Sequence, residues 1–349
     1  MLTNADLAEL LARSSETEEG HRQRALRRAA RAALTWAEEA IALTDGDRSL
    51  TEFPGVGRWL AHTITSWLEK PPDIPEPVET RRGFLTLTEV RSTVDAHPEW
   101  RSGLRADLQM HTTHSDGSVG VREMVEACSA LGYEHVAITD HSKGLKIARG
   151  MDEERLTRQG REIDLLNEEL SAAGSRIRAL RAIEMNLSPE GEGDMDPVAL
   201  AKLDLVLGAF HSKLRTTEDQ TERYLAALRN PTVHVLAHPR GRKFNRREGL
   251  RADWPRVFAA ARELDVALEI DAYPDRQDLN VELLRLAGDA GVRISIGTDA
   301  HHPEELRFME FGLAAAIQAG IPRDRILNVL PSDQLRTWAR ETSGRRGGR

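Results

Sequence analysis

Short apolar runs alternate with helical stretches through most of this 349-residue chain, and this alternation limits the possible folds more than any other feature. Helical patterns occur at residues 120–132, 152–174 and 278–291. The apolar runs have the length and composition of buried strands, which predicts a parallel sheet covered by helices. Seven strand–helix units fit a TIM-like α/β barrel. The runs are RADLQMH (105–111), HVAITDH (135–141), IRALRAIEM (177–185), LDLVLGAFH (203–211), VHVLAHP (233–239), VALEIDA (266–272) and VRISIGTDAH (292–301).

The composition changes near residue 70, where EKPPDIPEPVETRRG places four prolines within residues 71–77. Such a segment is typical of an extended linker. We therefore predict a small helical domain over residues 1–70, a linker over 71–103, the barrel over 104–341 and a basic tail over 342–349. Residues 20–43 have a helical pattern that places Leu26, Ala30, Ala33 and Ala37 on one face.

Composition also narrows the class of protein. Cys128 is the single cysteine, which excludes an internal disulfide and fits a reducing cytoplasm. The N-terminal residues do not resemble a signal peptide, and no apolar run approaches the roughly 20 residues that a membrane-spanning helix needs. The net charge of −8 argues against non-specific coating of nucleic acid, although it allows a local basic groove. We expect a soluble cytoplasmic protein with no membrane partner and no obligate protein partner.

Imidazoles and carboxylates stand at the ends of successive predicted strands. One histidine at a strand end is usually a structural residue, but recurrence on seven strands is not expected by chance. The carboxyl ends of barrel strands converge on one face, where such folds carry their chemistry. We therefore interpret these side chains as metal ligands; the strand-end residues are His111, His141, Glu184, His211, His238, Asp271, and Asp299 with His301.

The ligand types suit zinc, manganese or iron, since imidazole and carboxylate occur without thiolate. The candidate set is too large for one ion, so we expect two or three divalent ions (Zn²⁺ and/or Mn²⁺). Such a cluster favours hydrolysis of phosphate esters, although amidohydrolases also have a histidine-rich barrel mouth. We leave His114, His234 and His302 out as structural or rim residues. The predicted ligands are His111, Asp116, His141, Glu184, His211, His238, Asp299 and His301.

Cations beside these residues favour phosphate as the substrate group, because the arginine fork suits phosphate oxygens. The stretch HPRGRKFNRREG begins at the ligand candidate His238, and SKGLKIARG follows His141. For any one of these residues a solvated basic loop is an equally good explanation. The group as a whole is better explained by phosphate binding; it comprises Arg240, Arg242, Lys243, Arg246 and Arg247, with Lys143, Lys146 and Arg149.

The motifs DLQMHTTHSDG, AITDHS, AIEMNL, GAFHS, AHPRGR and GTDAHH resemble, in this order, those of the PHP (polymerase and histidinol phosphatase) superfamily. The resemblance covers roughly residues 104–340 and is strongest to the C-terminal PHP domain of bacterial X-family DNA polymerases, where HPRGRKFNRRE and DAYPDRQDLN also have counterparts. It implies a distorted (β/α)7 barrel, three metals and phosphoesterase activity. It also implies that His111, Glu184 and Asp299 share one metal, that Asp116, His141 and His301 share a second, and that Glu184, His211 and His238 share a third.

One position departs from the family pattern. The usual His-x-His motif reads Gln109-Met110-His111 here. Because a neutral amide is a poorer ligand than imidazole, we expect the first metal to bind more weakly or to be a harder ion such as manganese. Some X-family PHP domains look similar at this position, so we do not interpret the change as inactivation.

The N-terminal region bears on the substrate. Gly55 and Gly57 follow Pro54 between helical patterns and resemble a helix–hairpin–helix, in which backbone N–H groups bind a phosphate. A generic helical turn would also explain them. The preceding RQRALRRAARAAL resembles the arginine-containing helix of X-family polymerases; its arginines are Arg22, Arg24, Arg27, Arg28 and Arg31. Residues 71–103 are too short to hold a polymerase palm.

The sequence therefore predicts a metal-dependent phosphoesterase acting on DNA 3′ ends and gaps, as a 3′-phosphatase or 3′–5′ exonuclease. Two alternatives remain: a small-molecule phosphomonoesterase of the histidinol-phosphatase kind, and a non-catalytic DNA-binding adaptor. The predicted catalytic residues are Glu184, Asp299, Arg240 and Arg242. The predicted DNA contacts are Gly55, Gly57, Arg27, Arg28, Arg149 and Lys243.

Overall fold

The computed structural model describes residues 1–347, and within them seven strands form one parallel sheet in sequence order. A parallel bridge between Met110 and Ala300 joins the segments that follow the first and last strands, so the sheet is a nearly closed barrel. The predicted α/β barrel is confirmed. The strands are β1 (Ala106–Asp107), β2 (His135–Ile138), β3 (Arg178–Asn186), β4 (Leu205–Ala209), β5 (Val235–Leu236), β6 (Ala267–Asp271) and β7 (Ile294–Gly297).

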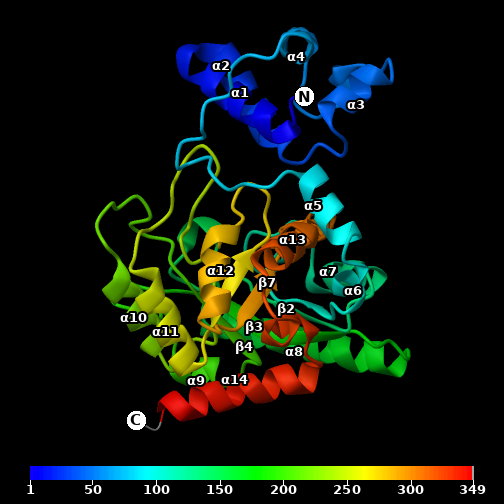
Figure 1. Cartoon of the computed structure of the whole chain (residues 1–349). Helices are drawn as coiled ribbons and strands as arrows, with labels where there is room; N and C mark the ends of the chain where they lie inside the picture. Colours follow the sequence, from blue (N-terminus) through cyan, green and yellow to red (C-terminus); the bar gives the residue numbers. More distant parts are fainter. Residues whose placement is uncertain (348–349) are drawn as a thin grey trace.

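Helices cover the outside of the barrel (Figure 1). Local signals in the sequence start several of them: the side chains of Asp152, Asp253 and Asn280 accept hydrogen bonds from backbone N–H groups in the first turns of α8, α11 and α12. The covering helices are α7 (Val121–Ala130), α8 (Glu153–Ala172), α9 (Pro197–Leu200), α10 (Thr221–Arg229), α11 (Trp254–Leu264), α12 (Val281–Asp289) and α13 (Met309–Ala319), with short 3₁₀ helices η2 (Lys146–Ala148), η3 (Pro303–Phe308), η4 (Arg323–Arg325) and η5 (Leu327–Val329).

The last helix, α14 (Ser332–Gly347), closes the amino-terminal end of the barrel. Its Leu335 and Trp338 belong to the same buried cluster as Ala106 and Val235, which lie at the starts of strands. The predicted basic tail is therefore wrong for residues 342–347, which continue this helix. Arg346 donates hydrogen bonds to backbone carbonyls at the end of α10, so its charge fixes the helix instead of extending into solvent. Residues 348–349 lie outside the described residues.

The N-terminal helices have a hydrophobic core of their own, which includes Leu11, Leu26 and Ile64. The single helix predicted over residues 20–43 is wrong: α2 ends at Ala33, and Ala37 is exposed. The chain leaves the helical path because Trp36 turns inward, where it stacks on Phe53 at 4.5 Å between ring centres. The elements are α1 (Asn4–Thr17), α2 (Gly20–Ala33), α3 (Ala40–Asp45), the 3₁₀ helix η1 (Leu50–Glu52) and α4 (Arg58–Glu69).

The predicted linker is only partly extended. Residues 71–77 contain no helix or strand, but α5 (Leu87–Asp95) and α6 (Pro98–Ser102) follow within the same segment. Helix α5 begins with a capping box between Thr86 and Glu89. Its Val90 and Val94, four residues apart on one face, are buried in the main barrel core. The linker prediction is therefore wrong for residues 87–102, which pack as part of the barrel.

The loop over residues 239–250, which follows β5, is one of the places where the N-terminal region is fastened to the barrel. The Leu87 N–H also donates to the Leu34 carbonyl at 2.8 Å, and Arg31 pairs with Asp275 at 3.4 Å. Phe244 from this loop lies within the N-terminal hydrophobic core. Arg81 is buried and donates hydrogen bonds to both carboxylate oxygens of Glu9, at 2.7 and 2.8 Å, and to Asn245 Oδ1 at 2.8 Å. The N-terminal helices and α14 therefore lie at opposite ends of the barrel, as Figure 1 shows.

Candidate metal centre

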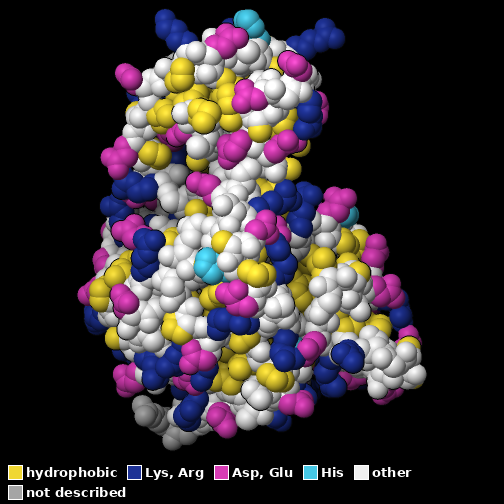
Figure 2. Space-filling model, turned by 45° about the vertical axis from the view of Figure 1, so that its right-hand side comes forward, with side chains coloured by type: hydrophobic (Ala, Val, Ile, Leu, Met, Phe, Trp, Pro, Cys, Tyr) yellow, Lys and Arg dark blue, Asp and Glu magenta, His cyan; other side chains and the backbone are white. Residues whose placement is uncertain are grey.

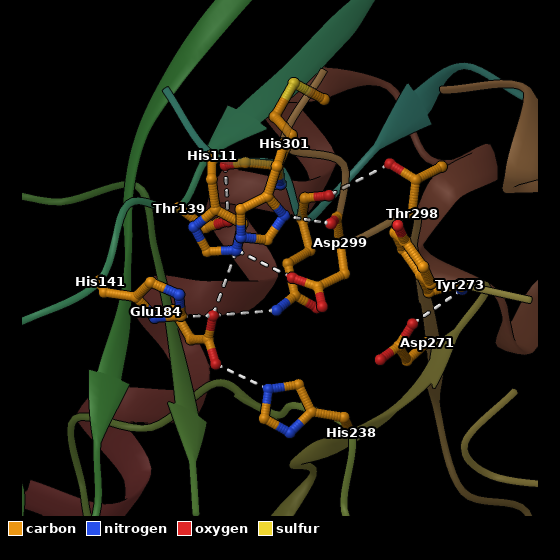
Figure 3. A network of polar contacts seen from close by, with 12 residues as sticks. His111, Thr139, His141, Glu184, His238, Asp271, Tyr273, Thr298, Asp299 and His301 are labelled. Atoms are coloured by element: carbon orange, nitrogen blue, oxygen red, sulfur yellow. Dashed lines mark hydrogen bonds and ion pairs between the residues drawn. The ribbon is translucent and has the colours of Figure 1, made fainter. Parts of the chain in front are cut away.

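The predicted ligands lie at the carboxyl ends of the strands, at the end of the barrel opposite α14. Figure 3 shows six of them close together: His111, His141, Glu184, His238, Asp299 and His301. Glu184 lies within β3, His238 follows β5, and Asp299 follows β7. His238 has φ of +27° and Asp299 has φ of +52°, a left-handed backbone that is uncommon for residues other than glycine. Strained positions of this kind cluster at functional sites, where the surrounding structure holds them in place.

Glu184 is the centre of the group and is fully buried. Its Oε1 lies 2.7 Å from His238 Nε2 and 3.0 Å from His211 Nε2. Its Oε2 lies 3.2 Å from His141 Nδ1 and 3.3 Å from His111 Nε2. One carboxylate therefore touches four imidazoles that come from four different strand ends.

The other two carboxylates complete the group. Asp299 Oδ1 lies 2.9 Å from His111 Nε2. Asp116 Oδ1 lies 3.6 Å from His141 Nε2 and 3.4 Å from His301 Nε2. Within the described residues, three sets have ligand atoms that all lie within 4.8 Å of one another: His111, Asp116, His141 and His301; His141, Glu184 and His211; and His111, Glu184 and Asp299. With the contact of His238 to Glu184, the structure brings all eight predicted ligands together.

The donor atoms of this group fit divalent metal ions. Imidazole nitrogens and carboxylate oxygens face one another at ligand spacing, without thiolate, which suits zinc or manganese. Gln109 Oε1 is buried and accepts no hydrogen bond from any described residue. Buried polar atoms are normally satisfied, so its free lone pairs are consistent with a cation in this space.

Charge within the group favours ionised carboxylates. Burial acts to raise the pKa of Glu184, but His141 and His238 hold that pKa well below its ordinary value. The pKa of Asp299 is likewise low, because Arg276 and His111 outweigh the effect of burial. Anionic carboxylates in a closed, buried space attract cations, which is the electrostatic requirement for a metal site.

A family comparison matches residues 107–271 to the PHP domain. A probable phosphatase from Acetivibrio thermocellus is 31% identical over 233 residues, which cover 64% of this chain and 90% of that protein. The chain belongs to the PHP family.

Two further relatives differ in how they match this PHP chain. The DNA polymerase/3′-5′ exonuclease PolX of Bacillus subtilis is 39% identical over 281 residues, which cover 79% of this chain. The chain spans only 46% of the length of that relative. A histidinol phosphate phosphatase structure from Lactococcus lactis matches with a TM-score of 0.44 and 18% identity, covering 62% of this chain and 94% of that one. That likeness is too distant to bear on the ligands of this site.

Gln109 occupies the place of the missing imidazole in this PHP site. Its Nε2 donates a hydrogen bond to Glu184 Oε2 at 3.2 Å, and its Oε1 has no partner among the described residues. The backbone of β7 approaches closely here: a Cβ at Gly297 would lie 2.5 Å from the Gln109 Cβ, so only glycine fits. The amide therefore reaches the ligand group, with its oxygen free to act as a weak ligand.

Sequence reasoning missed two residues that hold the ligands. Arg276 Nη2 lies 3.0 Å from Asp299 Oδ2, and the signal was present in the DAYPDRQDLN motif. Asp140 accepts hydrogen bonds from the backbone N–H groups of Thr112 and Ser115, and thereby fixes the loop that carries His111 and Asp116.

Asp271, a strand-end residue left out of the ligand set, lies 3.6 Å from Arg276, and burial raises its pKa to about 8.

The side chains predicted to bind phosphate differ in their burial and in the partners that they contact. Arg242 is buried with its guanidinium 3.8 Å from the centre of the Phe84 ring, and it donates a hydrogen bond to the Arg82 carbonyl at 2.8 Å. No sequence pattern reveals a stacking partner about 160 residues away, and the role of Arg242 toward the substrate stays a prediction. Lys243 pairs with Asp275 at 3.5 Å, whereas Arg149 is exposed. The backbone N–H of Arg240 donates a hydrogen bond to Asp278 Oδ2 at 2.9 Å.

The three histidines predicted to lie outside the ligand set are outside it. His114 pairs with Glu162 at 2.7 Å, and His302 caps η3. His234 lies at the other end of the barrel, 2.8 Å from the Ser343 hydroxyl on α14. Within the described residues, no helix is both long enough and apolar enough to cross a membrane.

Proposed function

We propose that this chain is a metal-dependent phosphoesterase acting on DNA 3′ ends, as a 3′-phosphatase or 3′–5′ exonuclease. The observation that carries the proposal is the Glu184-centred ligand group, in a chain that shares 39% identity over 281 residues with the relative named a DNA polymerase/3′-5′ exonuclease. Two or three divalent ions, Zn²⁺ and/or Mn²⁺, would be held by the eight ligands. Bound there, they would lower the pKa of water and neutralise phosphoryl charge.

The residues of the chain have separate roles in this proposal. Glu184 bridges the ligand sets, and Arg276 holds Asp299 in its ionised form. Arg240 lies within the turn that begins at His238, and its fork is a predicted cation for phosphate oxygens. Asp140 and Gln159 hold the loop after β1: Gln159 donates to Asp140 Oδ2 at 2.5 Å.

The N-terminal region supplies further contacts for DNA. Arg27 and Arg28 are exposed on α2. Gly55 has φ of +83° and packs against Ala29 and Ala32 of the same helix, so the glycine turn and the arginine helix lie side by side. Gly57 precedes α4, whose backbone N–H groups are free to bind a phosphate. Lys243 and Arg149 add positive charge at the barrel.

The test is hydrolysis of an end-labelled, 3′-phosphorylated oligonucleotide by metal-free protein to which Mn²⁺ or Zn²⁺ is returned. We expect release of the 3′-phosphate or stepwise shortening that requires metal and is lost in Asp299→Ala. Arg178→Gln is the matched control, because Arg178 is exposed at the start of β3, at the opposite end of the barrel.

Two outcomes would replace the proposal. Cleavage of p-nitrophenyl phosphate without any change in DNA would favour the small-molecule phosphomonoesterase, a reading supported by the relative named a probable phosphatase. Binding of DNA without turnover of either substrate under any metal would favour the adaptor.

A further inference from the structure

A cleft of about 220 Å³ lies between two loops that both begin at predicted metal ligands. One wall is the loop after β4, which starts at His211 and carries Arg215. The other wall belongs to the loop after β5, which starts at His238 and carries Arg246 and Arg247. The cleft contains none of these ligands, and its Arg215 stands four residues after His211, within about 14 Å along the chain.

Three of the four arginines that line the cleft, Arg215, Arg246 and Arg247, lack counter-charges within the described residues. Glu248 is the carboxylate on the wall, and it pairs with Arg251 at 2.7 Å. In the part of the chain that the structure describes, no carboxylate lies within 4 Å of the guanidinium groups of Arg215, Arg246 or Arg247. The Nε of Arg247 is buried and has no hydrogen-bond partner there. Burial, followed by the charges of Arg276 and Arg215, lowers the pKa of Arg247.

The arginine wall is held rigidly. Lys243 and Arg247 exchange two backbone hydrogen bonds, of 3.0 and 2.9 Å, across a tight hairpin. At its tip the Asn245 N–H donates to the Thr80 carbonyl at 2.8 Å, and the Asn245 side chain accepts from Arg81 at 2.8 Å. The hairpin backbone that carries Arg246 and Arg247 is therefore ordered before a ligand binds, which limits the conformational entropy lost on binding.

We propose that this cleft binds a backbone phosphate of the DNA strand other than the phosphate that is hydrolysed. The proposal rests on the proposed function and deepens it: the substrate is a polyanionic strand, with its end at the metal centre and a neighbouring phosphate between Arg215 and Arg247. Figure 2 shows Lys and Arg side chains at the waist between the helical region and the barrel, with Asp and Glu side chains among them.

The first test compares substrates that differ in internal phosphates. A nucleoside 3′-monophosphate has none, whereas a 3′-phosphorylated trinucleotide has two. We expect the wild-type chain to prefer the trinucleotide in kcat/KM, and the double variant Arg215→Gln/Arg247→Gln to reduce that preference about tenfold, chiefly through KM. Arg178→Gln removes one positive charge from the far end of the barrel and should leave the preference unchanged. An unchanged preference in the double variant, or an equal loss on both substrates, would overturn the proposal.

The second test does not depend on hydrolysis. Binding of a fluorescent trinucleotide to the full chain is measured in EDTA over a range of salt concentrations. In the double variant, loss of the contact to this one phosphate should reduce the slope of log K against log salt by about 0.7, the value per phosphate for single strands. If p-nitrophenyl phosphate is cleaved but neither nucleotide is, the proposed function fails. The binding measurement still tests whether the cleft binds phosphate, because an unchanged slope in the double variant excludes it as a phosphate site.

Discussion

The two ends of the barrel are built from the same seven strands but serve different purposes. At the carboxyl end, buried imidazoles meet carboxylates and leave acceptor atoms unsatisfied. At the amino end, α14 covers the strand starts with Leu335 and Trp338, and apolar contacts predominate. His234 and His238 stand on either side of β5, only four residues apart, yet one contacts a helix hydroxyl and the other contacts Glu184.

The difference shows that the environment of a histidine, and not its residue type, decides its role. Burial lowers the pKa of His234 to about 3, which keeps the ring neutral. The pKa of His238 is raised despite burial, because Glu184 stabilises the charged ring. The amino end should therefore control stability and the carboxyl end should control activity, and the following changes test that division.

The largest effect should come from Glu184→Gln. The amide keeps the shape of the side chain but removes the charge shared by four imidazoles, so metal-dependent turnover should fall at least about a thousandfold, about 4 kcal/mol in activation free energy. Turnover and metal content are measured together, with His234→Gln as the control at the other end. Activity within tenfold of wild type would show that Glu184 is not the centre of the site.

Trp338→Ala should act on stability alone. Trp338 is buried against the strand starts, and loss of a buried tryptophan side chain costs about 3–5 kcal/mol in the free energy of unfolding. Denaturant unfolding measures the loss, and kcat per folded molecule should not change. Leu165→Ala on the exposed side of α8 is the control and should change stability by less than about 0.5 kcal/mol. A fall in kcat would mean that the two ends are coupled.

His234 should make the protein less stable in acid. Its pKa is about 3 in the folded chain and roughly 6.5 in the unfolded chain, so the unfolded state binds a proton first as the pH falls below 6.5. Stability is therefore complete above pH 6.5 and decreases towards pH 3, by about 2 kcal/mol at pH 5.

Replacing His234 with Gln should remove this contribution. The difference between the unfolding free energies of wild type and variant should change by about 2 kcal/mol between pH 7.5 and pH 5. If the unfolding free energies of wild type and variant change with pH in parallel, His234 titrates alike in the folded and unfolded states.

The smallest effect should come from Gln109→His, which restores the usual family motif. An imidazole in place of the amide should raise zinc affinity about tenfold, about 1.4 kcal/mol, in competition with a chromogenic chelator. Gln334→His, on α14 at the other end, should leave the affinity unchanged. Equal affinity in Gln109→His would mean that the amide oxygen already serves as a full ligand.

The parts of the molecule that depend on local pattern could be predicted from the sequence. All seven strands and the convergence of His111, Glu184 and Asp299 follow from buried runs that end in polar residues. The stacking of Arg242 on Phe84 could not be predicted, because such a contact has no periodicity and joins distant segments. For the same reason, the sequence could not predict that Phe244 packs in the N-terminal hydrophobic core, which is far away in the sequence.

The position of Phe244 has a consequence for proteolysis. Phe244 stands six positions after His238, a span of at most about 20 Å, so a predicted metal ligand and the N-terminal core are linked by one short segment. A protease that cuts within residues 71–77 would break the chain without releasing either piece. Glu9 on the first piece would still hold Arg81 on the second, and Phe244 would still fill the core of the first. The nicked protein should therefore elute as one particle, and its pieces should separate only in denaturant.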